Sequence, residues 1–432
     1  MSPIEIGFAG IVLLFILLLV VKVPVGIGMI IVSIVGNMLL STPANALAKF
    51  GSDLILLAEN YNLSVIPLFV LMGIFVSEAG FVSDLYDIIN SIVGKIRGGM
   101  AIATIGAGAA FGAVCGSAVA CASTVASVSV PEMCRHDYDP GFAASVAAVG
   151  STLGIVIPPS TTLVLYGVLT EESIGQILIG GFLPGIITAL LLMITSYVMV
   201  RRNPKLAPKQ AETVPFSWEK FKNIWAIPLI FIISFGGIYL GFFTPTEAGA
   251  VGAFSSLLFA LVTRKLKVED FVEALSYSCR VTAMVFVIII GGMMFGAFLT
   301  RSLIPMWLTS YIEALNAPPW MIMFIILAIY TIMGCFIDAL AAMVIMTPVL
   351  YPVIISLGYN GVWFGVVTAM MLLTGLLTPP VGVSSLVVAS VTKIPSTKIF
   401  KAQLPFLLTL IVSSIIMIFF PDIILFLPRM MY

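Results

Sequence analysis

Two pairs of neighbouring prolines are the residues with the clearest chemical consequence in this sequence. Pro158–Pro159 and Pro379–Pro380 each lie inside a long apolar segment. A proline in a helix removes a backbone donor and clashes with the preceding turn, so we expect both helices to break. Carbonyls freed by a break can bind a hard cation, and the following half-helix directs its positive end at an anion. One such break is usually a structural kink, whereas two matched breaks favour a binding site.

The proline pairs belong to an internal duplication of the whole chain. The offset of 221 residues (379 − 158) between them also relates Pro24 to Pro245 and Pro184 to Pro405. Matching broken helices in the two halves of a membrane protein are typical of secondary transporters, which bind substrate and ions where the repeats meet. The duplication therefore predicts a transporter.

The composition places the chain in a lipid bilayer. Of its 432 residues, 60% are hydrophobic and 9% are charged, against roughly 45–50% and 25% in soluble domains. Residues 2–21 are apolar with Glu5 as their only charge, so they lack the basic region and cleavage site of a signal peptide. We expect this stretch to be the first span. Among binding partners of the protein we expect membrane lipid and no nucleic acid.

Reactive side chains are few, which excludes several classes of function. The five cysteines form no CxxC motif, which excludes a disulfide framework and a zinc ribbon. His136 is the only histidine, which argues against a Ser-His-Asp centre and an intramembrane enzyme. No GxxxxGK[ST] motif is present to hold ATP phosphates. We expect no enzymatic activity and no cofactor, with energy from an ion gradient or another chain.

Apolar segments of about 20 residues, the length of a membrane span, occur in the same order in both halves. In the first half, residues 1–200, the predicted spans are 4–22, 24–40, 63–80, a broken helix at 141–170, and 175–199, with a re-entrant hairpin at about 99–133. After a polar linker at 201–223, the second half, residues 224–432, has spans at 224–242, 245–263, 281–300, a broken helix at 361–391, and 402–420, with a hairpin at about 320–353. We predict an all-α polytopic membrane protein.

Basic residues predict the orientation of the spans. The linker holds six Lys and Arg residues and should face the cytoplasm. The span count then places 17 of the 20 basic residues on the cytoplasmic side and leaves Lys49, Arg301 and Arg429 outside. Because five spans per half is an odd number, we expect inverted repeats with both termini periplasmic.

Several motifs together resemble the large membrane subunit of tripartite ATP-independent periplasmic (TRAP) transporters, over essentially the whole chain: Phe111–Ala120, Ser151–Ser160, Phe243–Gly249, Gly334–Asp338, Thr347–Pro348 and Thr378–Gly382. The resemblance implies an elevator-type transporter of the bacterial inner membrane that imports an organic acid anion with sodium. It also implies two partners, a small Q-type membrane subunit and a periplasmic P-type substrate-binding protein. Cys121 replaces the acidic residue or threonine of many relatives, which leaves a side-chain role there open.

With this resemblance, we predict two or more coupling sodium ions, with a site between the hairpin tip and the broken helix of each half. The few intramembrane carboxylates fit sodium better than a proton relay. Hydroxyls in apolar helices usually bond to the preceding turn, so carbonyls are the stronger ligands. The candidate ligands are Gly116, Ser117, Ser151 and Gly154 at the first site, and Gly334, Thr374, Gly375 and Thr378 at the second.

A substrate site is predicted around one buried acid and one arginine. Asp338 is the only carboxylate of the second hairpin, and a charge at that depth needs a partner. Arg301 resembles the substrate-site arginine of sialic-acid members of the family, although it could instead snorkel to the outer interface. With Ser117 and Thr162, this pair would frame a sugar acid, which favours N-acetylneuraminate over a C4-dicarboxylate or another sugar acid. An ion channel is the alternative that is not a carrier.

Overall fold

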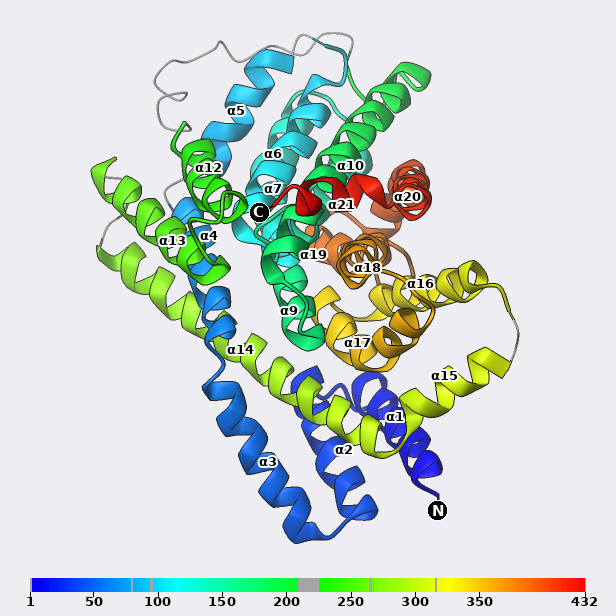
Figure 1. The fold of residues 1–432 in the computed structure, drawn as a ribbon. Coiled ribbons are helices and arrows are strands. Elements are labelled where there is room, and N and C mark those ends of the chain that lie inside the picture. Colours follow the sequence, from blue (N-terminus) through cyan, green and yellow to red (C-terminus); the bar gives the residue numbers. More distant parts are fainter. Residues whose placement is uncertain are drawn as a thin grey trace.

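The computed structural model describes residues 2–78, 81–93, 96–208, 225–263, 266, 268–314 and 317–431, and all regular structure in these ranges is helical. Most of the predicted linker, from 209 to 223, lies outside the described residues. Figure 1 shows the path of the helices through the molecule.

The helices form two series in the same order. The first series is α1 (Pro3–Leu19), α2 (Val25–Leu40), α3 (Pro43–Ala58), the short η1 (Tyr61–Ser64), α4 (Val65–Glu78), α5 (Phe81–Val93), α6 (Gly99–Cys115), α7 (Ala118–Arg135), α8 (Pro140–Thr152), η2 (Leu153–Ile155), α9 (Thr161–Thr170) and α10 (Ile174–Arg202). The second series is α12 (Ala226–Tyr239), α13 (Pro245–Val262), α14 (Val268–Arg301), α15 (Ile304–Ala314), α16 (Pro319–Phe336), α17 (Ala339–Ser356), α18 (Gly361–Gly375), α19 (Val383–Thr392), α20 (Ser396–Phe419) and α21 (Asp422–Arg429).

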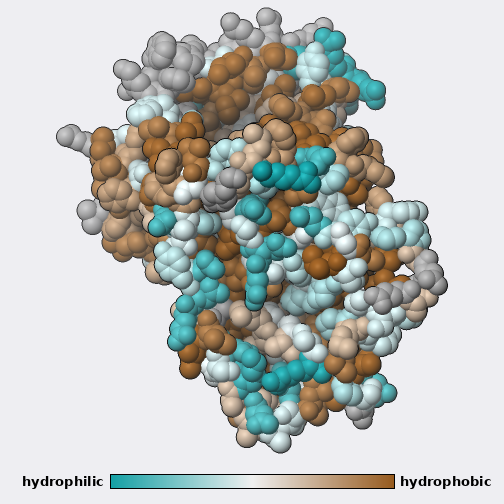
Figure 2. Space-filling view, in the orientation of Figure 1, coloured by the Kyte–Doolittle hydropathy of each residue, from teal (hydrophilic) through white to brown (hydrophobic). Residues whose placement is uncertain are grey.

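Apolar side chains cover broad areas of the outside (Figure 2). Phe242, Phe254 and Leu408, for example, are 74%, 66% and 66% exposed, as expected where lipid rather than water surrounds the protein. Within the described ranges, six helices are long and apolar enough to cross a membrane, namely α10, α13, α14, α16, α17 and α20, and the halves of both broken helices are among the shorter apolar ones. The prediction of an all-α membrane protein is confirmed.

Each series contains one helical hairpin. α6 and α7 are joined at Gly116 and Ser117, and α16 and α17 are joined at residues 337 and 338. Gly116 has a φ of 64°, which glycine adopts without strain. The side chains of Ser117 and Asp338 cap the second helix of each hairpin by accepting a hydrogen bond from its first turn, at 3.5 and 3.1 Å. The two caps are one repeat apart (338 − 117 = 221), so the duplication extends to the hairpin tips.

Both tandem-proline segments break a helix, as predicted. α8 passes into the 3-10 turn η2, and the chain resumes as α9 only at Thr161. In the second series α18 ends at Gly375 and α19 begins at Val383. The peptide bonds within Pro158–Pro159 and Pro379–Pro380 are cis. Each break lies beside the hairpin tip of its own series, because α6 packs along α8 and η2, and α16 packs along α18.

The two series also exchange contacts with each other. α7 of the first hairpin packs against α19, and α17 of the second hairpin packs against α9. The outer helices pair in the same crossed way, with α2 on α14 and α13 on α4. In Figure 1 the two hairpins reach the centre of the molecule from different sides, α6 and α7 from above and α16 and α17 from below right. Equivalent elements therefore have equivalent partners, as an inverted repeat requires.

Hydrogen bonds hold α9 and the residues after it to the second hairpin and α18. The Tyr166 hydroxyl donates to the Gly361 carbonyl at 2.8 Å, and the Tyr351 hydroxyl donates to the Glu172 carboxylate at 2.7 Å. Tyr166 is fully buried, and its ring meets those of Tyr351 and Phe364 edge-on. The broken helices and hairpins of both series thus form one packed body.

Several elements differ from the sequence prediction: α3, α5, α15 and α21 were not predicted, and α14 is longer than predicted. α3 was not predicted, because Lys49 and Asp53 interrupt its apolar residues, so residues 43–58 do not read as a span. α14 runs over 34 residues, whereas the predicted span covered 281–300. Its first turns contain Glu269 and Glu273, which hid the beginning of the helix from a search for apolar segments.

Candidate functional site

A cavity of about 590 Å³ lies where the two hairpin tips face α4 and α14. Its wall contains both hairpin caps, Ser117 and Asp338, and the first residue of α9, Thr161. α14 contributes Glu273 and Tyr277, and α19 and α4 supply further lining. A largely apolar cavity with a few polar groups, at the junction of the two repeats, is where a transporter of this architecture is expected to bind its substrate.

The electrostatics of the cavity come from helix ends and acidic side chains. α7 and α17 begin directly after their caps, Ser117 and Asp338, and α9 begins at Thr161, so three helix N-termini lie at the wall. Such ends carry partial positive charge and unpaired N–H groups, and they stabilise anions. The charged side chains among the lining residues are Glu273 and Asp338, with neither Lys nor Arg in that set. The backbone therefore supplies the positive potential for an anion.

At the first tip, α6 and η2, the turn that follows α8, meet without intervening side chains. A Cβ atom on Gly154 would lie 2.9 Å from the Cα of Gly112, so the two backbones are in contact. The carbonyl of Gly116, at the tip, accepts the hydroxyl of Thr161 at 2.9 Å, and a Cβ atom on Gly116 would lie 2.7 Å from the carbonyl oxygen of Pro159. The structure thus brings the hairpin tip and the break of the first series together.

The second tip has the same construction. A Cβ atom on Gly375 would lie 2.8 Å from the Cα of Gly334. After the break, the Gly382 backbone N–H donates to the Cys335 carbonyl at 3.2 Å. The C-terminal ends of α16 and α18 meet here, as the end of α6 and η2 do at the first tip, and the last carbonyls of a helix lack intrahelical partners. Carbonyl oxygens are suitable ligands for a hard cation, so both tips fit the cation sites predicted from the sequence.

Three of the four predicted hydroxyl ligands donate to carbonyls of the helix that contains or immediately precedes them. Ser151, Thr374 and Thr378 each donate to a carbonyl three or four residues earlier, at 2.7, 3.0 and 2.8 Å. Ser151 also lies away from the tip, because a Cβ on Gly108, two turns before the end of α6, would be 2.7 Å from the carbonyl carbon of Gly150. Backbone carbonyls are therefore better placed as ligands than these hydroxyls.

Thr162 lies elsewhere than predicted, and Cys121, whose role the sequence left open, packs within the hairpin. Thr162 is buried outside the set of cavity-lining residues, and Thr161 takes the place at the wall. The thiol of Cys121 is also buried and donates to the Gly108 carbonyl at 3.5 Å, where α7 packs back on α6. Cys121 thus joins the two helices of the hairpin.

The structure does not bring Arg301 and Asp338 into one cavity. Val285 of α14 lines the central cavity, and Arg301 follows it by 16 residues (301 − 285), which is about 24 Å along a helix. Arg301 instead lines a separate hollow with Lys49, and its Nη1 donates to Asn37 Oδ1 at 3.2 Å. The predicted pairing of Arg301 with Asp338 is therefore wrong, because α14 continues past the cavity before it reaches Arg301.

The comparison with known families agrees with this geometry. Residues 12–423 match the family model described as "Tripartite ATP-independent periplasmic transporter, DctM component". The chain belongs to this family. It is the large membrane subunit of a bacterial TRAP transporter and a multi-pass membrane protein with a role in organic acid import.

Relatives of this DctM component are similar over most of their length. A C4-dicarboxylate TRAP transporter large permease protein of Pseudomonas aeruginosa is 35% identical over 373 residues, which are 86% of this chain and 87% of that protein. The sialic acid TRAP transporter large permease protein SiaM of Vibrio cholerae is 31% identical over 415 residues, 96% of each chain. The solved YdaH transporter of Alcanivorax borkumensis aligns with a TM-score of 0.64 at 15% identity, over 88% of this chain and 90% of that one, and shares the fold.

Gln403 was not among the residues predicted from the sequence. This side chain on α20 is fully buried. Its amide N–H donates to the Leu377 carbonyl at the second break, and its Oε1 accepts the hydroxyl of Ser385 on α19 at 2.8 Å. The signal was present in the sequence, since Gln403 is the only amide in the predicted span 402–420 and a buried amide requires partners.

We predict that Asp338→Asn changes transport while it preserves the cap of α17. Asn caps a helix about as well as Asp, so the free energy of unfolding should change by less than about 0.5 kcal/mol. A carboxylate at the cavity would attract the cation predicted to enter with the acid, so its loss should lower uptake of the transported acid about tenfold, equivalent to about 1.4 kcal/mol. Thermal unfolding in detergent and proteoliposome uptake measure the two effects.

The control is Ser390→Ala, which alters the same cavity without changing its charge. The Ser390 hydroxyl bonds to the Val387 carbonyl at 2.8 Å in its own helix, so uptake should be retained. Wild-type uptake by Asp338→Asn would remove Asp338 from the site.

Proposed function

We propose that this chain couples the inward movement of sodium ions to the import of an organic acid anion. The observation that carries the proposal is the central cavity, where three helix N-termini face a space whose charged side chains are two carboxylates. Helix ends can hold the carboxylate of a substrate. The acidic side chains repel it, so cations that enter with the anion lower the electrostatic cost. Cotransport with a cation follows from this balance.

In this proposal each hairpin tip holds one sodium ion. The main ligands are backbone oxygens at the points where two helix ends and a break meet, and the hydroxyls named above are secondary. A bound sodium ion supplies positive charge beside the substrate carboxylate, while the chain orients both through its capped helix starts. The backbone ligands are Gly116 and Gly154 in the first series and Gly334 and Gly375 in the second.

The proposed movement is of the elevator type. The hairpins and broken helices of both series form one packed body, which we assign as the moving part. α2 packs on α14, α13 packs on α4, and α4 and α14 pack on each other beside the cavity, so we assign these four helices as the fixed part. The substrate would then cross the membrane with the moving body, past α4 and α14.

The substrate class is an organic acid, with N-acetylneuraminate and a C4-dicarboxylate as the two candidates. Both are the substrates by which the relatives above are named. The preference for N-acetylneuraminate depended on Arg301 at the substrate, and its place in a separate hollow removes that support. We further propose a Q-type small subunit and a P-type binding protein as partners, and a topology with both termini periplasmic.

The proposal is tested by uptake into proteoliposomes that contain the chain with its small subunit. Labelled N-acetylneuraminate and labelled succinate are offered with the cognate binding protein, with an inward sodium gradient or an equal potassium gradient. We expect one of the acids to accumulate only with sodium and only with the binding protein. Equal uptake in potassium would exclude sodium coupling, and non-saturable flux without the binding protein would favour a channel.

A further inference from the structure

A second hollow, of about 720 Å³, lies at the ends of three apolar helices. Its lining includes Pro3, the first residue of α1, Leu40, the last residue of α2, and Arg301, the last residue of α14. α14 from Phe271 to Arg301 is long and apolar enough to cross a membrane. Because apolar helices end near the boundary between lipid tails and headgroups, the hollow lies at the depth of lipid headgroups.

The basic side chains of this hollow lie on the side of the membrane where few basic residues are predicted. The topology predicted above leaves three basic residues on the outer side, and two of them, Lys49 and Arg301, line this one hollow. The third, Arg429, is paired with Asp422 at 2.6 Å, and Lys49 is paired with Asp53 at 2.5 Å. Within the described part of the chain, no ion pair involves Arg301. The hollow thus carries one uncompensated positive charge.

The guanidinium of Arg301 is held in place by a neutral group. Its Nη1 donates to Asn37 Oδ1 at 3.2 Å, and Asn37 is buried and donates its own amide N–H to the Ser33 carbonyl at 2.8 Å. A guanidinium has five N–H donors, so this anchor fixes its position and leaves donors for a ligand. A planar fork of this kind binds phosphate with two parallel hydrogen bonds.

The surroundings of the hollow are amphipathic. Ser41, Asn45 and Ser52 line it with hydroxyl and amide groups. Within two residues of the lining residues in sequence, Leu39 and Leu303 are 64% and 42% exposed. In Figure 2 hydrophilic side chains gather at the lower end of the molecule, where Figure 1 places α2 and α3. A ligand with an anionic head and an apolar body would satisfy both surfaces.

We propose that this hollow binds the phosphate headgroup of an anionic phospholipid of the outer leaflet. The phosphate would lie between Arg301 and Lys49, the glycerol oxygens against Ser41 and Asn45, and the acyl chains along the exposed leucines. The site is separate from the central cavity and does not depend on the proposed transport function. Its occupancy would fix the outer end of α14 at the level of the headgroups.

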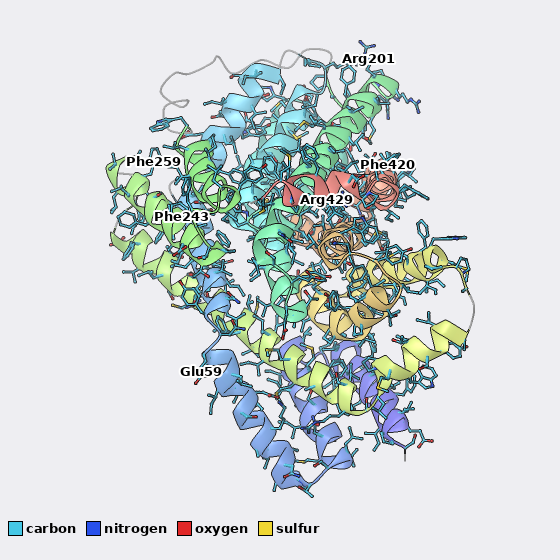
Figure 3. All side chains as sticks on the ribbon, in the orientation of Figure 1. Glu59, Arg201, Phe243, Phe259, Phe420 and Arg429 are labelled. Atoms are coloured by element: carbon cyan, nitrogen blue, oxygen red, sulfur yellow. The ribbon has the colours of Figure 1, made fainter. Side chains whose placement is uncertain are left out.

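Native mass spectrometry of the protein released from nanodiscs of mixed phosphatidylglycerol and phosphatidylcholine tests the proposal. We expect tight retention of phosphatidylglycerol by the wild type and a loss of about tenfold in Arg301→Gln, equivalent to about 1.4 kcal/mol. Arg301→Lys keeps the charge and should retain most of the lipid. Arg429→Gln is the matched control, because Arg429 lies on α21 far from the end of α14 (Figure 3), and it should bind as the wild type does.

Three results would overturn the proposal. Equal retention in Arg301→Gln and Arg429→Gln would show that the lipid lies elsewhere. Equal retention of phosphatidylcholine would show that the anionic charge is not recognised. Displacement of the lipid by millimolar glycerol 3-phosphate or succinate would assign the hollow to a soluble anion. Wild-type thermal unfolding of Arg301→Gln is the check that a lost lipid does not reflect a lost fold.

Discussion

Gly375→Ala is expected to destabilise the folded protein by about 1–3 kcal/mol, the usual cost of adding a methyl group to a closely packed core. The added Cβ would lie 2.5 Å from the Thr331 carbonyl oxygen and 2.8 Å from the Gly334 Cα. Both neighbours are backbone atoms, so α16 and α18 would have to separate at the second hairpin tip. The midpoint of thermal unfolding in detergent measures the change in stability.

The matched control for Gly375→Ala has the opposite expected sign. Gly51 is also within a helix, α3, and a Cβ there would meet no atom within 4 Å. Because alanine is favoured over glycine in a helix interior, Gly51→Ala should stabilise the protein by about 0.5–1 kcal/mol. If both variants shift the midpoint in the same direction, the close contact of α16 with α18 is not the reason why position 375 requires glycine.

Sodium dependence should also distinguish the two glycine variants. In the proposed function the backbone at Gly334 and Gly375 forms the second sodium site, so a separation of these helices should raise the sodium concentration needed for half-maximal uptake. Gly51 lies outside that region and its variant should leave the concentration unchanged. A destabilised Gly375→Ala with a wild-type sodium response would place the ion elsewhere.

Gln403→Leu is the second change with a large expected effect. It removes the donor to the buried Leu377 carbonyl and the acceptor of the buried Ser385 hydroxyl. A buried polar group left without a partner costs about 1–3 kcal/mol, and this substitution leaves two such groups beside the second break. We expect a lower unfolding midpoint and, because the break is displaced, weaker sodium-dependent uptake.

The double variant Gln403→Leu, Ser385→Ala tests whether the hydrogen bonds are the cause. Ser385→Ala removes the hydroxyl that Gln403→Leu leaves unsatisfied, so the two changes together should cost less than the sum of the single changes. Gln176→Leu is the control, since Gln176 is only partly buried near the start of α10, and surface changes are usually within about 0.5 kcal/mol. Strict additivity of the two changes would contradict the proposed link.

The sequence predicts the elements that follow from local chemistry. Proline pairs break a helix in any surroundings, and both breaks lie where Pro158–Pro159 and Pro379–Pro380 required. The hairpins were expected at about 99–133 and 320–353, and the helices that form them run from 99 to 135 and from 319 to 356. Capping by Ser117 and Asp338 could be anticipated, because both types are preferred helix starts.

The partners of single side chains could not be predicted in the same way. The sequence marks Gln403 as a buried amide but does not say that its partners are on the second break and α19, since that depends on how three helices pack. The same limit applies to Arg301, which is close to the predicted substrate site only if α14 ends there. The partners of both residues depend on tertiary packing, which cannot be read from a repeat in the sequence.

The crossed packing of the hairpins affects how the protein can be made. Besides its contacts within the first half, α7 packs on α19, and α9 packs on α17. The first half therefore leaves the ribosome with faces whose partners have not yet been made. These faces cannot find their partners until α17 and α19 have been synthesised and inserted. Membrane insertion and the final assembly of the pocket are therefore separate events, and the second must follow synthesis of nearly the whole polypeptide.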